Sequence, residues 1–342
     1  MTAYDYDAIV SHSKDTGQMG IPVYNSVNKA INFAAEANKK NFRIFIEEGV
    51  YHERLSINVP GISLIGEKGK ETVIVFNLAA GSVKGNNDLS GTWFCATVIV
   101  SAAGFSAQNI RFENSFDYPA NALKPDGGPE KIFDTQAVAL MTCGDNDRAS
   151  FYDCSFVGYQ DTLFIDSGRH YFENCRISGH IDFIFGAGQA VFNKCDIISR
   201  PRPGEFPSGY LTAPSTDISK PYGFLFDDCR LLKEKGVDAG SVCLGRPWHP
   251  RGKLSCSGSA VFFKCFMDDH IGAKGYDRIS SITKEGRKLW FEIKPDSRFF
   301  EFESYGPGAI INSGRPQLPL ESLHWHTSEN IFNGWVPLKF QD

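Results

Sequence analysis

Residues 171–197 read YFENCRISGHIDFIFGAGQAVFNKCDI and contain one short phrase twice, an aromatic strand that ends in a polar residue and a cysteine. The phrase returns as FYDCSF, FDDCRL and FFKCFM, so its cysteines are Cys154, Cys175, Cys195, Cys229 and Cys265. The successive steps are 21, 20, 34 and 36 residues. A repeat of about 20 residues with insertions in some turns is typical of a solenoid.

Each repeat is too short to bury its own apolar face, so neighbouring repeats must stack to form a continuous core. RFENSF at 111–116 places Ser115 at the cysteine position and reads as one earlier repeat. The pattern predicts an all-β protein, a right-handed parallel β-helix built as a single-stranded solenoid. We expect one domain over residues 1–342, because the repeat fills most of the middle and 42% of the residues are hydrophobic.

The two ends of the chain are predicted to close the solenoid. Residues 22–40 contain an apolar stripe at helical spacing, formed by Val23, Val27, Ile31 and Ala34 with Ala30 beside it. Such a helix would cover the bare strand edges of the first coil. Residues 315–342, with LESLHWH at 320–326, predict a tail that packs back on the solenoid as a short helix and an irregular segment.

Between these ends the sequence departs from the repeat of about 20 residues in four places. FRIFIEEGVYHERLSI (42–57) alternates like two paired strands that turn at Glu48 and Gly49. Three stretches rich in glycine, proline and charge are predicted to be loops, at 118–132, 199–209 and 268–289. Long loops on a rigid scaffold commonly wall a binding groove.

Composition argues against several classes of protein. A net charge of −5 and a pI near 5.9 disfavour a nucleic-acid-binding protein. No stretch approaches the roughly 18 apolar residues of a membrane span, and the first residues, MTAYDYDAIVSHS, lack the apolar core of a signal peptide. No CxxC or Cys/His cluster has zinc spacing, so we expect no metal and no other cofactor. We expect a monomer.

The nine cysteines are expected to be mostly buried thiols, because free cysteine packs as a small hydrophobe. Adjacent coils could still be bridged, since their Cα separation falls inside the disulfide range of roughly 4.4 to 6.8 Å. Cys175 with Cys195 is the candidate pair.

Two aspartates occupy one position of successive repeats. Asp161 follows Cys154 by seven residues in GYQDTLF, and Asp182 follows Cys175 by seven in HIDFIFG. Equivalent residues of neighbouring coils lie one strand spacing apart, about 4.7 to 4.9 Å, and close like charges resist joint ionisation. A single aspartate would most simply cap a turn or pair with a cation. Two in matching register predict a catalytic pair.

Four further residues are candidates for the same site. Gln136 in QAVAL and Gln160 beside Asp161 each carry two N–H donors, which suits an oxyanion hole, although an amide ladder along the solenoid would explain either one alone. Arg246 in LGRPWHP can fix one carboxylate by a bidentate pair and so separate the roles of the two aspartates. Trp248 offers a flat face to a sugar ring, or is a core side chain.

The motifs GVYHE (49–53), QAVAL (136–140), GYQDTLF, DFIFG and LGRPW occur in the order found in pectin methylesterases, and the chain resembles a bacterial-type member of that family, carbohydrate esterase family 8. The similarity extends from about residue 5 to 335 and includes SGYLTAPST (208–216) and DSRFFEF (296–302). The family's fold is a right-handed parallel β-helix, which agrees with the fold expected from the repeat.

The resemblance implies a role for each candidate. Asp182 would be the nucleophile, Asp161 the general acid and then base, and Gln136 and Gln160 the oxyanion hole, while Arg246 would hold Asp182 ionised. The implied substrate contacts are Trp248, Phe185, Met267, Ile181 and Thr97. His180 stands where relatives often carry a small residue, which predicts an altered subsite preference.

The resemblance also implies the reaction and its setting. The C6 methyl esters of pectin (homogalacturonan) would be hydrolysed to pectate and methanol without a metal. A bacterial pectinesterase of this kind would be secreted, either to the exterior or to the periplasm.

Three other functions fit part of the pattern. A retaining glycosidase places two carboxylates about 5 to 5.5 Å apart, near the strand spacing, but needs no oxyanion hole. A calcium-dependent lyase would need a larger acidic cluster for the ion. A carbohydrate-binding module without activity would account for Trp248, but not for two stacked aspartates beside an arginine.

Overall fold

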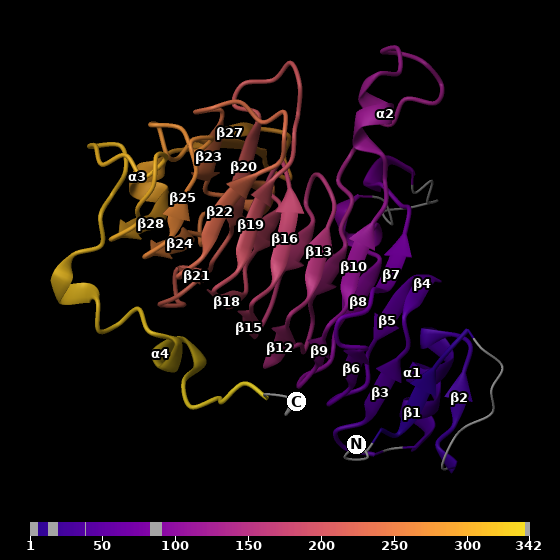
Figure 1. The fold of residues 1–342 in the computed structure, drawn as a ribbon. Coiled ribbons are helices and arrows are strands. Elements are labelled where there is room, and N and C mark those ends of the chain that lie inside the picture. The colour runs from indigo at the N-terminus through magenta and orange to yellow at the C-terminus, as the bar shows by residue number, and fades with distance from the viewer. Residues whose placement is uncertain (1–5, 13–19, 38, 83–90, 339–342) are drawn as a thin grey trace.

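The computed structural model describes residues 6–12, 20–37, 39–82 and 91–338. Three parallel sheets run the length of one solenoid, and a typical coil contributes one strand to each sheet in turn (Figure 1). The chain forms the right-handed parallel β-helix that the repeat predicts.

The three sheets, given in the spatial order of their strands, contain most of the regular structure. Sheet A holds β2 (Val23–Tyr24), β1 (Ala8–Val10), β3 (Arg43–Ile46), β6 (Ser63–Gly66), β9 (Ser106–Gln108), β12 (Ala149–Tyr152), β15 (Arg169–Glu173), β18 (Gln189–Asn193), β21 (Phe224–Asp227), β24 (Gly258–Phe263) and β28 (Ser297–Phe302). Sheet B holds β25 (Phe266–Met267), β22 (Arg230–Lys233), β19 (Asp196–Ser199), β16 (Arg176–Gly179), β13 (Ser155–Val157), β10 (Arg111–Asn114), β7 (Thr72–Phe76) and β4 (Gly49–His52). Sheet C holds β23 (Val242–Gly245), β20 (Gly209–Pro214), β17 (Ile184–Gly186), β14 (Leu163–Ile165), β11 (Leu140–Thr142), β8 (Val98–Val100) and β5 (Leu55–Ile57).

The repeated phrase of the sequence builds the corner between sheets A and B. The five cysteines of the repeated phrase form a ladder along this corner, and the residue before each of these ladder cysteines has a left-handed backbone with φ from 51° to 55°. These residues are Asp153, Asn174, Lys194, Asp228 and Lys264. Asp and Asn tolerate this conformation because their short polar side chains bond locally. The polar residue therefore turns the chain, and the cysteine after it points into the core.

The aromatic residue of the phrase forms a ladder in the core. One phenylalanine per coil stacks on the next with ring centroids 4.6 to 4.7 Å apart, in the series Phe151, Phe172, Phe192, Phe226 and Phe262. All five are fully buried. Their spacing matches the separation of neighbouring strands, so the stacked coils set the ring spacing.

All nine cysteines are free thiols, so the predicted disulfide between Cys175 and Cys195 is not present. The Sγ of Cys175 lies 3.5 Å from the carbonyl oxygen of Phe151 and 3.4 Å from that of Glu173, so its single S–H can donate to either. Cys195 donates to the carbonyl of Phe172 in the same way, at 3.5 Å. Each thiol thus has main-chain partners and fills the corner as a small core residue.

A helix covers the N-terminal coil as expected, but it is shorter than the predicted range of 22–40. Helix α1 (Val27–Ala37) buries the predicted residues Val27, Ala30, Ile31 and Ala34, whereas Val23 belongs to strand β2. The carboxylate of Glu53, in the GVYHE motif, accepts hydrogen bonds from the main-chain N–H groups of Val27 and Asn28 at 2.8 and 2.9 Å. This motif therefore caps the helix, whose first N–H groups have no partner within the helix.

The expected pairing within residues 42–57 is wrong. Strand β3 lies in sheet A and β4 in sheet B, because the chain turns a corner of the solenoid at Glu47 and Glu48. Two of the predicted loops contain regular structure. Residues 118–132 begin with helix α2 (Tyr118–Ala122), and residues 268–289 include most of an antiparallel hairpin, β26 (Ile279–Ile282) with β27 (Lys288–Phe291).

The C-terminal segment lies on the outer face of sheet A. Leu318, Ile331 and Phe332 are buried there against the outward side chains of β18, β21 and β24. The remaining short helices are η2 (Ala80–Ser82), η3 (Thr92–Phe94), η4 (Pro250–Gly252), α3 (Ile293–Asp296), η5 (Leu320–Ser322) and α4 (Ser328–Phe332). Within the ranges described, no helix combines the length and the apolar character that a membrane crossing requires.

Candidate active site

Asp161 and Asp182 stack on consecutive coils, and each lies two residues before a strand of sheet C, β14 and β17 respectively. Strands β14 and β17 pair with Leu163 opposite Ile184, and the main-chain N–H of Asp161 donates to the carbonyl of Ile181 at 3.0 Å. The register predicted from the sequence is therefore confirmed. Both aspartates have positive φ, 61° and 49°. Such left-handed backbones are uncommon outside glycine and often occur at functional positions.

Arg246 holds Asp182 with two parallel hydrogen bonds. Its Nε donates to Oδ1 at 2.8 Å and its Nη2 to Oδ2 at 2.6 Å. Arg246 directly follows β23, two coils beyond Asp182, and its guanidinium carbon lies 4.0 Å from the ring centroid of Tyr210 on the coil between. Burial disfavours the charged arginine, but the charge of Asp182 and the hydrogen bonds to it outweigh burial and raise the pKa of Arg246. Arg246 therefore stays charged beside Asp182.

Asp161 has the opposite environment. Its side chain is 8% exposed, and burial raises its pKa well above the usual aspartate value, with the charge of Asp182 adding to the shift. The charge of Arg246 and a hydrogen bond from Thr92 act in the other direction but are smaller. Asp161 is thus favoured as a neutral acid beside the carboxylate that Arg246 holds, which is an arrangement that acid catalysis beside a nucleophile requires.

Gln136 and Gln160 lie next to each other on neighbouring coils. A parallel bridge joins the two residues, and the N–H of Ala137 donates to the carbonyl of Gln160 at 3.0 Å. The hydroxyl of Thr135 donates to Oε1 of Gln160 at 2.8 Å, which leaves the two amide N–H groups of Gln160 for other acceptors. The sequence had not singled out Thr135. Gln160, which directly precedes Asp161, thus keeps its uncharged N–H donors available, and Gln136 is its bridge partner on the neighbouring coil.

Four aromatic side chains form a strip along β14 and β17. Phe164 and Phe185, each three residues after a site aspartate, stack with centroids 4.2 Å apart. Trp248 meets both edge-on, and Trp93 meets Phe164 edge-on at 4.9 Å. Phe185 is only 3% exposed, so its ring mainly supports Trp248, whereas Trp93 is exposed. The two tryptophans are the flat surfaces available to a ligand.

Two predicted substrate contacts are contradicted by their burial. Met267 is fully buried, and its Sδ lies 3.2 Å from Nη2 of Arg315 in the core. Thr97 is also fully buried, and its hydroxyl donates to the carbonyl of Glu113 at 2.9 Å. Besides Thr135, Thr92 in η3 acts on the site, because its side chain lowers the pKa of Asp161 against the effect of burial.

Ile181 and His180 lie directly before Asp182. Ile181 is nearly buried and packs with Tyr210 and Cys243. His180 is buried, its Nδ1 accepts the N–H of Ile181 at 2.8 Å, and Tyr118 of α2 packs edge-on against its ring. Burial, followed by the charges of Arg202 and Arg200, lowers the pKa of His180 to about 3. This histidine is therefore a neutral support for the backbone that carries Asp182.

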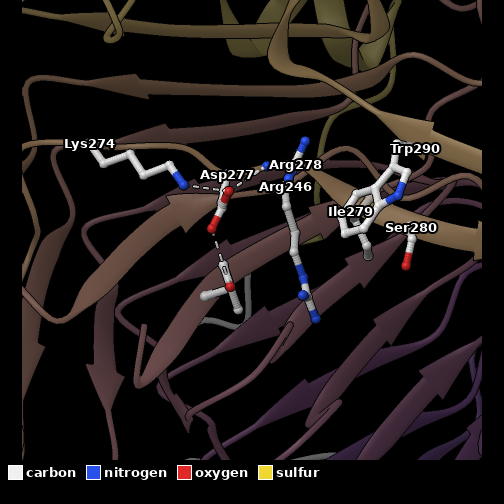
Figure 2. A pocket seen from close by; sticks show the side chains of 8 residues that line it. Arg246, Lys274, Asp277, Arg278, Ile279, Ser280 and Trp290 are labelled. Atoms are coloured by element: carbon white, nitrogen blue, oxygen red, sulfur yellow. Dashed lines mark hydrogen bonds and ion pairs between the residues drawn. The ribbon is translucent and has the colours of Figure 1, made fainter. Parts of the chain in front are cut away.

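A cavity of about 550 Å³ adjoins the arginine that holds Asp182. Its lining residues are Tyr210, Arg246, Lys274, Asp277, Arg278, Ile279, Ser280 and Trp290. In Figure 2, the side chain of Arg246 lies between Asp277 and Lys274 on one side and Trp290 on the other. Most of this wall comes from the segment predicted as a loop at 268–289.

One cluster among the described residues has the composition of a cation site, namely Asp268, Asp269 and His270. The ammonium group of Lys233 lies 2.5 Å from Oδ1 of Asp269. A lysine already balances part of the cluster's negative charge, so we assign no metal to it.

A parallel β-helix that holds an arginine-bound carboxylate and a buried carboxyl of raised pKa on adjacent coils, beside the exposed Trp93 and the half-buried Trp248, is the architecture of a hydrolase that acts on a polysaccharide. The family model described as Pectinesterase matches residues 12–314, and the chain belongs to the pectinesterase family. The resemblance seen in the motifs is thereby confirmed.

Relatives of both bacterial and plant origin align over most of the chain. Pectinesterase A of Dickeya dadantii (strain 3937) is 42% identical, over 98% of this chain and 93% of its own length. Probable pectinesterase 8 of Arabidopsis thaliana is 32% identical, over 86% of this chain and 67% of its own length. The structure of pectin methylesterase from Yersinia enterocolitica superposes with a TM-score of 0.85 at 44% identity and covers 92% of this chain and 100% of that one.

Proposed function

We propose that this chain hydrolyses the C6 methyl esters of pectin to pectate and methanol, with Asp182 as the nucleophile and Asp161 as the acid and base. The observation that carries the proposal is the bidentate Arg246–Asp182 pair beside the buried Asp161. Arg246 keeps the attacking carboxylate ionised and aimed, while burial keeps a proton on its neighbour. Membership of the pectinesterase family supports the choice of substrate.

The first half of the reaction transfers the acyl group to the protein. An oxygen of Asp182 attacks the ester carbonyl carbon, and the carbonyl oxygen becomes an oxyanion that accepts N–H bonds from Gln136 and Gln160. When this intermediate collapses, the bond to the methoxy oxygen breaks and Asp161 gives its proton to the departing methanol. The galacturonosyl group is then joined to Asp182 as a mixed anhydride.

The second half restores the protein. Asp161, now ionised, takes a proton from water, and the resulting hydroxide attacks the acyl carbon of the anhydride. The bond to Asp182 breaks, the free uronic acid leaves, and Asp161 again holds its proton. Neither half-reaction requires a metal or a cofactor.

Sugar rings would lie against Trp93 and Trp248, with Phe185 beneath and Ile181 at the edge of the site. A pectin methylesterase solved in complex with a hexasaccharide has a TM-score of 0.90 to this chain at 41% identity, which supports an extended polymer site here.

Because pectin is a polymer of plant cell walls, the enzyme would work outside the cytoplasm, at the exterior or in the periplasm. We propose that it acts as a monomer.

Product analysis tests the proposal. Highly methylated pectin is incubated with the purified protein, and methanol, new reducing ends and unsaturated products are measured together. We expect methanol alone, at constant polymer length. New reducing ends without methanol would indicate a glycosidase, unsaturated ends would indicate a lyase, and no product of any kind would indicate a binding module.

A further inference from the structure

We propose that Asn114 is a positioning residue for the esterase reaction, because its buried carboxamide ties the segment that carries Gln136 to the segment that carries Thr92. The inference rests on the proposed function and names what holds an oxyanion donor in place. Asn114 is the last residue of β10, on sheet B. It acts on the reaction through the main chain that it holds.

Two long insertions bring irregular chain to the site. In a regular coil the corner between sheets B and C is short, as in residues 158–162 between β13 and β14. The same corner is occupied by residues 77–97 between β7 and β8, and by residues 115–139 between β10 and β11. Thr92 belongs to the first insertion and Gln136 to the second. Each insertion leaves the strand ladder, so its position depends on contacts other than strand stacking.

The carboxamide of Asn114 joins both insertions. Its Nδ2 lies 2.9 Å from the carbonyl oxygen of Leu78, 3.0 Å from that of Cys95 and 3.1 Å from that of Val138. Its Oδ1 accepts the N–H of Leu78 at 3.3 Å and the N–H of Phe116 at 3.2 Å. Two amide N–H groups thus serve three carbonyl groups, and the amide oxygen serves two main-chain N–H groups. One side chain therefore fixes the relative position of three chain segments.

The partners of Asn114 lie close to site residues along the chain. Cys95 directly follows η3, and Val138 lies two residues after Gln136. A main-chain bond reinforces the link, because the N–H of Ala80 donates to the carbonyl of Gln136 at 2.8 Å. The amide of Asn114 thus stands directly behind both η3 and the oxyanion donor.

Burial makes this network hard to replace. Asn114 is only 2% exposed, so water has little access to its partners. Buried carbonyl groups that lose their donor are costly, and the chain around them has to move to find another. A displacement of about 1 Å in a group positioned for a reaction can cost about 100-fold in rate. Asn114 is therefore placed to affect kcat without contact to the substrate.

Methanol release from methylated pectin by Asn114→Asp, beside a matched control, tests the role. Aspartate keeps the shape of asparagine but has at most one O–H to donate in place of two N–H groups. The control is Asn146→Asp. Asn146 is also 2% exposed, and its side chain bonds to Ala102 and His170, which lie outside both insertions.

The two variants should separate a loss of stability from a loss of position. We expect both to lower the melting temperature, because both leave buried partners without a donor. We expect Asn114→Asp to lower kcat about 10- to 100-fold, and Asn146→Asp to keep kcat within about threefold of the wild type. Equal losses of kcat in the two variants would overturn the proposal.

A double-mutant cycle with Gln136→Ala tests whether Asn114 acts through that glutamine. Removal of one oxyanion donor costs about 100- to 1,000-fold in kcat. If Asn114 acts by positioning Gln136, adding Asn114→Asp to Gln136→Ala should lower kcat less than about threefold further. The two losses would multiply if Asn114 acted only on the fold, and that result would contradict the positioning role.

Hydrogen exchange of the wild type gives a readout that needs no variant to fold. We expect the amides of residues 78–81, 95–97 and 136–138 to become exposed together, because one side chain holds the three segments. Exchange of residues 95–97 that is independent of residues 136–138 would overturn the proposal.

The outcomes distinguish this inference from the proposed function. If the wild type releases methanol and Asn114→Asp keeps kcat within about threefold, the esterase stands and the positioning role fails. If the wild type releases no methanol, the esterase fails, and hydrogen exchange still decides whether Asn114 joins the three segments.

Discussion

Replacing Arg246 by lysine should slow the reaction without removing positive charge from the site. The arginine makes two parallel bonds to Asp182, at 2.8 and 2.6 Å, and its guanidinium packs on the ring of Tyr210. A lysine ammonium is a point charge on a flexible stem and does not reproduce a planar pair of donors. The variant keeps the ion pair and loses at least one hydrogen bond.

The expected size of the effect follows from that lost bond. A hydrogen bond to a charged group contributes about 1.5 to 3 kcal/mol, and each 1.36 kcal/mol of barrier is a factor of ten in rate, so kcat should fall roughly 10- to 150-fold. Steady-state methanol release from methylated pectin measures kcat, and a thermal melt reports the fold.

A second arginine of the solenoid supplies a matched control. Arg230 makes the same bidentate contact with Asp196 on sheet B, at 2.7 and 2.8 Å, but its side chain is 62% exposed against 20% for Arg246. Arg230→Lys should leave kcat within twofold, because a pair with an exposed arginine contributes about 0 to 1 kcal/mol to stability and this pair has no part in the reaction. If Arg246→Lys keeps kcat within threefold of the wild type, bidentate aiming of Asp182 is not part of catalysis.

Three further substitutions test separate parts of the account. Because burial and then the charge of Asp182 raise the pKa of Asp161, the folded state loses stability as pH rises through that pKa. Asp161→Asn should therefore have a higher melting temperature than the wild type at alkaline pH, and this difference in melting temperature should vanish below the usual aspartate pKa. A difference that grows in acid would contradict the prediction. Thr135→Val should lower kcat about 2- to 12-fold, because the Gln160 amide loses the hydrogen bond that orients it. Thr135→Ser keeps the hydroxyl and should restore kcat. Unchanged kcat in the valine variant would mean that Thr135 has no part in the site. Met267→Ala should cost about 2 to 5 kcal/mol of stability, seen in urea unfolding, with KM unchanged, and a raised KM in the folded variant would return Met267 to the substrate groove.

The fold could be predicted because the repeat is a physical consequence of stacking. A coil of fixed length brings Phe151 over Phe172 and Cys154 over Cys175, so the spacing in the sequence is the spacing of the strands. The same register predicts the stack of Asp161 and Asp182, each seven residues after its cysteine.

Residues outside the repeat had no such register. Thr92 lies in an irregular segment between β7 and β8, so nothing in the sequence links it to Asp161. Met267 follows a ladder cysteine, where alternation turns its side chain into the core. Val23 fits a helical stripe as well as a strand, and pairing with β1 decided between them.

The cavity wall shows the same limit. Arg278 and Trp290 are 12 residues apart in a stretch whose composition predicts a loop, and only the antiparallel pairing of β26 with β27 brings them together. Local patterns of charge and glycine carry no information about such a contact.

The most direct test of the central claim is the rate of methanol release by Asp182→Asn. This variant keeps the size and shape of the side chain and removes the attacking carboxylate. We predict that turnover falls by at least about 10⁴-fold, the scale seen when a covalent nucleophile is removed, while affinity for methylated oligogalacturonide stays within a few fold. Methanol release within tenfold of the wild type would contradict the assignment of Asp182 as the nucleophile.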